Sequence, residues 1–83
     1  MPQALRFTLY SRAGCGLCEE MIEELAALPQ AQAVPLDIAD VDQNALIRAR
    51  YGHKVPVLLL NGELVCHGRL DTEELHKALA ALR

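Results

Sequence analysis

The most informative part of this chain reads LYSRAGCGLC over residues 9–18 and continues as EEMI over residues 19–22. An alternating apolar run ends here, a short loop follows, and two cysteines separated by two residues lead into an amphipathic pattern with helical spacing. A strand, a loop, a Cys-x-x-Cys and a helix in this order are typical of a dithiol redox site. The first turn of a helix carries unpaired N–H groups and the positive end of the helix dipole, so a thiolate at Cys15 would be stabilised and its pKa lowered.

The helical spacing predicts different positions for the two cysteines. One stripe of the expected helix is apolar and contains Cys18, Met21, Ile22, Leu25 and Leu28. The other stripe is acidic and contains Glu19, Glu20, Glu23 and Glu24. Cys18 should therefore face the core and Cys15 should lie at the exposed tip, so we expect Cys15 to attack and Cys18 to resolve. Two other readings stay open at this point, namely two unreactive core cysteines and half of a zinc site.

Size and composition limit the classes of protein to consider. The chain has 83 residues, of which 52% are hydrophobic, and this predicts one globular domain over residues 1–83. A net charge of -3 and few aromatic residues argue against nucleic-acid binding. No apolar run approaches the roughly 20 residues of a membrane span, and the N-terminus lacks the apolar core of a signal peptide. We therefore expect a cytoplasmic protein, and in the cytosol a Cys-x-x-Cys is more often catalytic than structural.

The first half of the chain predicts two strands flanking a helix. Residues 5–10 alternate between apolar and polar side chains and should form a strand. The following helix should run to about Leu28, where Pro29 ends it. Residues 34–38 should form a second strand, and Pro35 assigns this strand to a sheet edge because proline cannot donate to a ladder.

A short helix over residues 43–51 should follow, with Asp40 or Asp42 as its N-cap and Gly52 as its C′ residue.

The second half predicts a hairpin and a closing helix. Residues 55–60 are continuously apolar and should form a central strand buried on both faces. Asn61-Gly62 is a strong hairpin signal, so residues 63–67 should return antiparallel. Asp71 should cap a last helix. The order βαβαββα, with a right-handed βαβ unit, predicts a three-layer α/β/α fold around a four-stranded mixed sheet.

With Cys15-Gly-Leu-Cys18 after the first strand, Val55-Pro56 before the central strand and this element order, the chain resembles the thioredoxin fold. It resembles more closely the glutaredoxins and their small glutaredoxin-like relatives. The resemblance implies that Cys15 is the nucleophile and Cys18 the resolving cysteine. It also implies a cis Val55–Pro56 bond beside the two sulfurs, with the backbone of Val55 pairing with an extended thiol substrate.

The resemblance implies further substrate-binding residues. Arg12 stands where a glutaredoxin carries a basic residue that meets a glutathione carboxylate, and its charge would also lower the pKa of Cys15. Gly68 matches the glycine that opens the last loop, and Asp71 lies where the family binds the other end of glutathione. The chain departs from the usual glutaredoxin pattern at Gly16 and Leu17, and at Arg69, which replaces the second glycine of the last loop. Asp71 is also fully explained as a helix cap.

These expectations define a function and its rivals. The resemblance implies a thiol–disulfide oxidoreductase that reduces protein or glutathione mixed disulfides in cell redox homeostasis. It would be a monomer without a bound cofactor, with glutathione as a candidate reductant, and with neither nucleic acid nor membrane as partner. One rival is a module that binds an iron–sulfur cluster or zinc through Cys15, and another is a thioredoxin-fold protein that recruits partners and has little activity. The third thiol, Cys66, should be a core or half-exposed residue.

Overall fold

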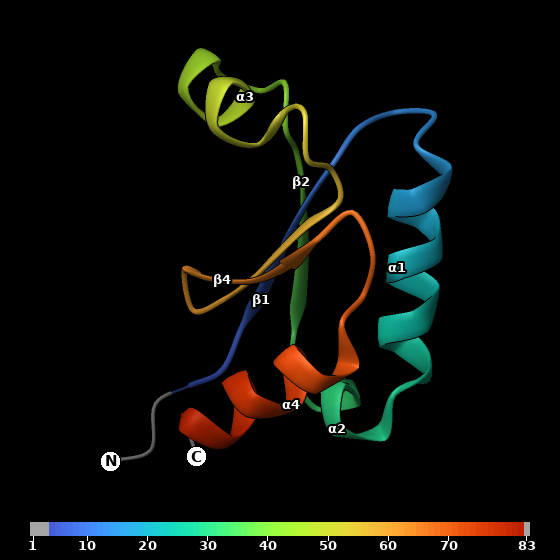
Figure 1. The fold of residues 1–83 in the computed structure, drawn as a ribbon, viewed down its shortest axis with the longest axis vertical. Coiled ribbons are helices and arrows are strands. Elements are labelled where there is room, and N and C mark those ends of the chain that lie inside the picture. The colour runs from blue at the N-terminus through green and yellow to red at the C-terminus, as the bar shows by residue number, and fades with distance from the viewer. Residues whose placement is uncertain (1–3, 83) are drawn as a thin grey trace.

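The computed structural model describes residues 4–82 (Figure 1). Its elements follow one another along the chain as β1 (Phe7–Ser11), α1 (Gly16–Ala27), α2 (Pro29–Gln32), β2 (Leu36–Asp40), α3 (Ala45–Tyr51), β3 (Val57–Leu60), β4 (Glu63–His67) and α4 (Thr72–Ala81). Apart from the extra turn α2, this is the predicted order. No helix within residues 4–82 is both long and apolar enough to cross a membrane.

The four strands form one mixed sheet in the order β2-β1-β3-β4. β1 and β2 run parallel, whereas β3 is antiparallel to both β1 and β4. Asn61 and Gly62 join β3 to β4, and both have positive φ, 50° and 83°, as a tight hairpin turn requires. β2 lies at an edge of the sheet, as Pro35 predicted.

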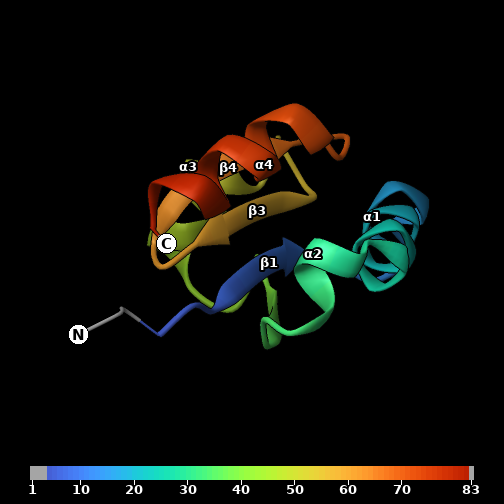
Figure 2. The same cartoon turned by 90° about the horizontal axis from the view of Figure 1, so that it is seen from below.

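One face of the sheet carries the hydrophobic core. The side chains that build it are almost fully buried and come from β1, β3, α1 and α4: Phe7, Leu9, Leu58, Leu60, Met21, Leu25, Leu75 and Leu79. α4 packs against β4 on this side (Figure 2). The alternation of Phe7 and Leu9 along β1 and the helical spacing of Leu75 and Leu79 along α4 place these side chains on one surface.

The other face is covered more thinly. None of the seven residues of α3, all of them described, is buried, and Leu46 is 84% exposed. The helix reaches the sheet at its C-terminal end, where the ring of Tyr51 stacks on that of Tyr10 with centroids 5.2 Å apart. Figure 1 shows α3 at the same end of the sheet as the loop between β1 and α1. The third layer is therefore present, and it lies over the end of the sheet where the cysteines are.

Of the predicted boundaries around Pro29 and Pro35, the end of α1 is confirmed and the start of the second strand was wrong. Pro29 does end α1, but it also occupies the first turn of α2, because proline fits a first helical turn as well as it terminates a preceding one. The second strand starts at Leu36 rather than Val34, since Pro35 lies outside it and only its carbonyl joins the sheet, accepting a hydrogen bond from the backbone N–H of Phe7 at 2.8 Å.

The limits and caps of α3 were also predicted wrongly. Asn44 caps the helix, its Oδ1 accepting from the N–H of Ile47 at 2.8 Å, whereas the prediction placed the cap at Asp40 or Asp42. Gly52 has φ -58°, so it follows the helix in a right-handed conformation and is not a left-handed C′ residue.

The central strand is shorter than predicted. It starts at Val57 and not at Val55.

Candidate dithiol site

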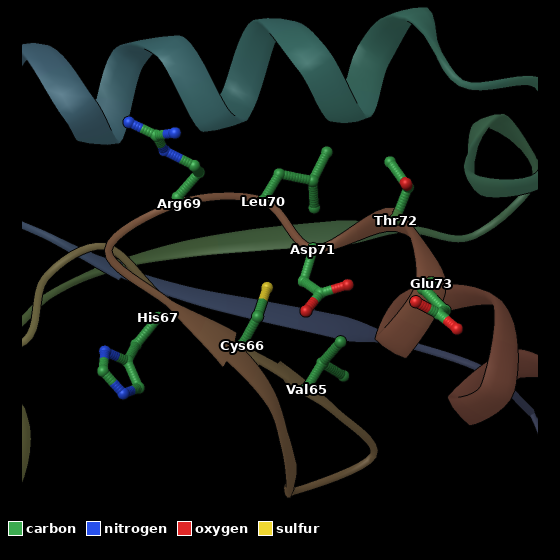
Figure 3. A pocket seen from close by; sticks show the side chains of 8 residues that line it. All are labelled: Val65, Cys66, His67, Arg69, Leu70, Asp71, Thr72 and Glu73. Atoms are coloured by element: carbon green, nitrogen blue, oxygen red, sulfur yellow. The ribbon is translucent and has the colours of Figure 1, made fainter.

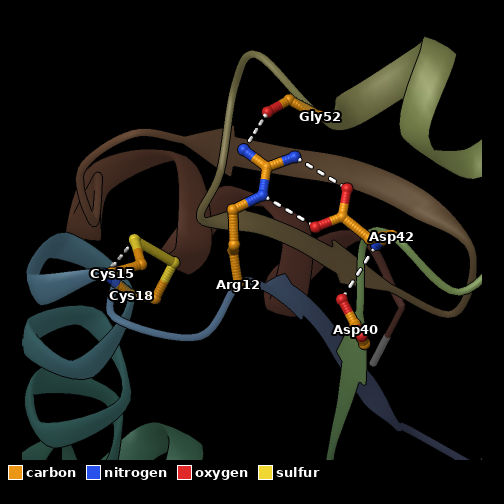
Figure 4. Close-up of polar contacts among 6 residues, drawn as sticks. All are labelled: Arg12, Cys15, Cys18, Asp40, Asp42 and Gly52. Carbon is orange, nitrogen blue, oxygen red and sulfur yellow. Dashed lines mark hydrogen bonds and ion pairs between the residues drawn. A yellow bond between two sulfur atoms is a disulfide. The ribbon is translucent and has the colours of Figure 1, made fainter.

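Cys15 and Cys18 form a disulfide at the N-terminus of α1 (Figure 4). Cys15 is the N-cap residue of the helix, and its Sγ accepts a hydrogen bond from the backbone N–H of Cys18 at 3.1 Å. Gly14, with φ +75°, turns the loop into this position. The sequence pattern predicted this placement, in which the first cysteine lies where the helix begins.

The two sulfurs lie in different environments. Cys18 is 1% exposed and faces the core, as the helical spacing predicted, while Cys15 is half-buried. A backbone N–H that points at Cys15 Sγ would also stabilise negative charge on this atom once the disulfide is reduced. The arrangement therefore offers one accessible sulfur with an anion-stabilising donor and one sheltered sulfur next to it.

Arg12 is turned towards Asp42 (Figure 4). Its Nε and Nη2 donate to the two carboxylate oxygens of Asp42, each at 2.9 Å, and its Nη1 donates to the carbonyl oxygen of Gly52 at 2.9 Å. The side-chain hydrogen bonds between Arg12 and Asp42 raise the pKa of Arg12 and lower the pKa of Asp42, and they outweigh the opposing effect of burial. We call this group of Arg12, Asp42 and Gly52 the Arg12 clasp.

The Arg12 clasp joins three segments that are distant in the sequence. Arg12 follows β1, Asp42 follows β2 and Gly52 follows α3. Asp40 orients Asp42, because its Oδ1 accepts from the backbone N–H of Asp42 at 2.9 Å. A Cβ added at Gly52 would lie 2.5 Å from the carbonyl oxygen of Arg48 and 3.3 Å from Nη2 of Arg12. A larger residue would therefore clash at this position.

Sequence reasoning missed Asp42 and Gly52 as partners of Arg12. They lie 30 and 40 residues away, and no local pattern relates them. One signal was available for Asp42, because the carboxyl ends of the parallel strands β1 and β2 meet at the same edge of the sheet and Ser11 is paired with Asp40. The residues that follow these two ends are therefore neighbours.

The Val55–Pro56 bond is cis, as the resemblance implied. Pro56 is fully buried and Val55 is half-buried just before β3. The carbonyl of Pro56 accepts a hydrogen bond at 2.7 Å from the N–H of Gly68, which has φ +75°. The structure thus brings together two of the implied substrate-binding segments, the proline loop and the loop after β4.

Asp71 caps α4, its Oδ1 accepting from the N–H of Glu74 at 3.0 Å, as predicted. It also lines a cavity of about 570 Å³ between β4 and the start of α4, into which Cys66 projects (Figure 3). Burial raises the pKa of the Cys66 thiol. Cys15, Cys18 and Arg12 are not among the residues that line this cavity.

No three His, Cys, Asp or Glu side chains within residues 4–82 are placed to hold a metal ion together.

A mixed sheet of this order, with a Cys-x-x-Cys at the start of its first helix and a cis-proline before its central strand, defines a protein of the thioredoxin fold. Residues 6–80 match the glutaredoxin-like domain (DUF836), so the chain belongs to this glutaredoxin-like family.

Solved structures with similar sequences support the assignment. Protein Ne2328 from Nitrosomonas europaea has a TM-score of 0.81 and 30% identity, over 100% of this chain and 96% of that one. Target protein XcR50 from X. campestris has a TM-score of 0.71 and 32% identity, over 93% of this chain and 99% of that one. A thioredoxin from Malassezia sympodialis, with 20% identity and a TM-score of 0.57 over 95% of this chain and 77% of that one, is similar in fold.

A relative found by its sequence matches over most of the chain. The uncharacterized protein Rv0508 of Mycobacterium tuberculosis is 31% identical over 77 residues, which are 87% of this chain and 79% of that protein.

Proposed function

We propose that this protein is a thiol–disulfide oxidoreductase that reduces protein or glutathione mixed disulfides through Cys15 and Cys18. The observation that carries the proposal is the unequal setting of the two sulfurs. Cys15 Sγ caps α1 and accepts from the N–H of Cys18, while the Cys18 side chain is 1% exposed. Such a setting favours a thiolate on Cys15 and keeps the second sulfur for an intramolecular step.

The proposed reaction has two exchange steps. The Cys15 thiolate attacks one sulfur of a substrate disulfide, forms a mixed disulfide and releases the first substrate thiol. The Cys18 thiolate then attacks Cys15 Sγ and releases the second thiol, which leaves the Cys15–Cys18 disulfide. Two electrons pass from the protein dithiol to the substrate, and two molecules of an external thiol such as glutathione return them and leave as a disulfide.

The neighbouring segments fit this reaction. The backbone of Val55 would pair with an extended substrate, and Pro56, which has no N–H, would leave room beside the sulfurs. No bound cofactor is needed. We propose a monomer that acts in the cytoplasm on disulfide-containing proteins or glutathione, in cell redox homeostasis.

Trapping of the first intermediate tests the proposal. The Cys18→Ser variant should accumulate a mixed disulfide at Cys15, detected by intact mass, because the resolving thiol is missing. Cys15→Ser should reduce no disulfide, whereas Cys66→Ser is the matched control and should behave as the unchanged protein does. Absence of any trapped adduct on Cys18→Ser, with every disulfide offered, would disprove the mechanism.

The pKa of Cys15 in the reduced protein gives a second test. Thiolate absorbance against pH, with Cys18→Ser as control, should give a value well below the roughly 8.5 of a free cysteine. A value at or above this would favour the metal-binding or partner-binding readings. Colour or metal in the purified protein would support the first of these.

A further inference from the structure

The cation nearest to the dithiol in the sequence is already engaged. The guanidinium of Arg12 has five N–H donors, and three of them are used within the Arg12 clasp. Nε and Nη2 donate to the two oxygens of Asp42 in a bidentate pairing. A substrate carboxylate would use the same two donors. An anionic substrate that approached Arg12 would have to compete with a carboxylate of the same chain.

Acidic side chains are exposed on α1, the helix that carries the dithiol. Glu19 and Glu20 follow Cys18 directly and are exposed. Arg69 lines a small hollow beside Leu17, but the same hollow is lined by Glu20 and Glu24. Leu17 itself lies between the two cysteines and is 53% exposed, so it offers apolar contact area. The first turns of α1 therefore present negative charge and an exposed apolar side chain next to the dithiol in the sequence.

We infer that the Arg12 clasp makes the dithiol discriminate against anionic thiols such as glutathione, and that its substrates are protein disulfides flanked by neutral or basic residues. This inference rests on the proposed oxidoreductase function and narrows it from two substrate classes to one. Glutathione carries two carboxylates, which the acidic side chains of α1 repel, whereas a basic polypeptide segment is attracted by them. The exposed Leu17 adds a contact that a polypeptide can use and a small charged thiol cannot.

An exchange equilibrium at Cys15 tests the inference without requiring turnover. In a Cys18→Ser background, Cys15 is loaded with glutathione and equilibrated with equal concentrations of glutathione and its glycine ethyl ester. The thiolate of one attacks the mixed disulfide and releases the other, so there is no net oxidation. Intact mass gives the ratio of bound glutathione to bound ester. The two thiols differ only in the glycine carboxylate.

The expected ratio is one or lower while Asp42 is present. In Asp42→Ala the guanidinium of Arg12 becomes available to the glycine carboxylate, and the ratio should rise about tenfold, as new charged hydrogen bonds form. Asp37→Ala is the matched control, because it removes the same charge from another exposed ion pair, with Arg6 at 2.8 Å, and it should leave the ratio unchanged.

Three results would overturn the inference. One is a ratio of about ten or more with Asp42 in place, and another is an equal rise in Asp42→Ala and Asp37→Ala. The third result concerns the protein with Asp42 in place. Added salt should raise the ratio because it screens the repulsion between the acidic side chains and the glycine carboxylate, so a fall on adding salt contradicts the inference. If the unchanged protein reduces no disulfide at all, the proposed function fails, whereas these ratios decide the substrate preference.

The same preference should appear in turnover of peptide disulfides. A disulfide flanked by lysines should be reduced with a higher kcat/KM than one flanked by glutamates, and added salt should diminish the difference. Equal rates for the two peptides, or a preference for glutamate, would count against the inference.

Discussion

At the scale of single residues, the three cysteines of this chain are distinguished by their surroundings alone. Cys15 is half-buried and caps a helix, Cys18 is buried in the core, and Cys66 projects from β4 into a cavity. Helix caps and N–H donors favour a thiolate, whereas burial opposes it. We therefore expect the three thiols to react at different rates in the reduced protein.

Alkylation of the reduced protein should reveal this difference. Iodoacetamide near neutral pH should modify Cys15 first, as followed by peptide mass mapping. Cys66 should react slowly, because burial raises its pKa above that of a free cysteine and leaves little thiolate at neutral pH. The rate at Cys66 should therefore keep rising above the roughly pH 8.5 at which a free cysteine is half ionised. Cys15→Ser serves as the control, and equal rates at Cys15 and Cys66 near neutrality would contradict the assignment.

At the scale of elements, the sequence predicted well those features that depend on neighbouring residues. The hairpin turn needs only Asn61 and Gly62, and the start of α4 needs only Asp71 and the N–H of Glu74. The same holds for Cys15 at the start of α1. Each of these features is fixed by geometry within four residues, so the local pattern suffices.

Features that depend on tertiary contacts were not predictable in this way. Asp40, Asp42 and Asn44 are all good N-cap residues, and only Asn44 is left to cap α3 because Asp42 binds Arg12 across 30 residues. Asp40 in turn holds the backbone of Asp42. The Arg12 clasp therefore occupies one of the candidate caps, and a search for local caps cannot detect this contact.

Two variants of Asp71 separate its role as the cap of α4 from a role in substrate binding. Asp71→Ala should lower the free energy of unfolding by about 1 kcal/mol, because the N–H of Glu74 loses its acceptor. Asp71→Asn should retain most of the stability while removing the charge. Denaturant unfolding of the two variants checks the cap. If Asp71→Asn also left the KM for glutathione mixed disulfides unchanged, the residue would act as a cap alone.

At the scale of the whole molecule, the core lies on one side of the sheet. β3 contributes to both sides, and all four of its residues are buried. Removing a side chain from this strand should therefore affect the entire domain, because a chain of 83 residues has only one core from which to draw its stability.

A matched pair of leucines tests this view. Leu58→Ala on β3 should cost about 2–5 kcal/mol of unfolding free energy, since its side chain is fully buried and leaves a cavity. Leu64→Ala on β4 should have a much smaller effect, because that side chain is 54% exposed. Thermal or denaturant unfolding measures both. Similar losses in the two variants would contradict the assignment of Leu58 to the core and of Leu64 to the surface.

The thin attachment of α3 has a consequence for local opening. This helix is held to the rest of the molecule at its C-terminal end by two contacts. The ring of Tyr51 stacks on that of Tyr10, and Arg12 donates a hydrogen bond to the carbonyl oxygen of Gly52. Its amide hydrogens should therefore exchange with solvent by a sub-global opening that leaves the core folded, and much faster than those of β3. Hydrogen exchange measures this directly, and equal protection in α3 and β3 would contradict it. Each such opening would also detach Gly52 from Arg12, so the electrostatic environment of the dithiol would fluctuate on the timescale of the helix.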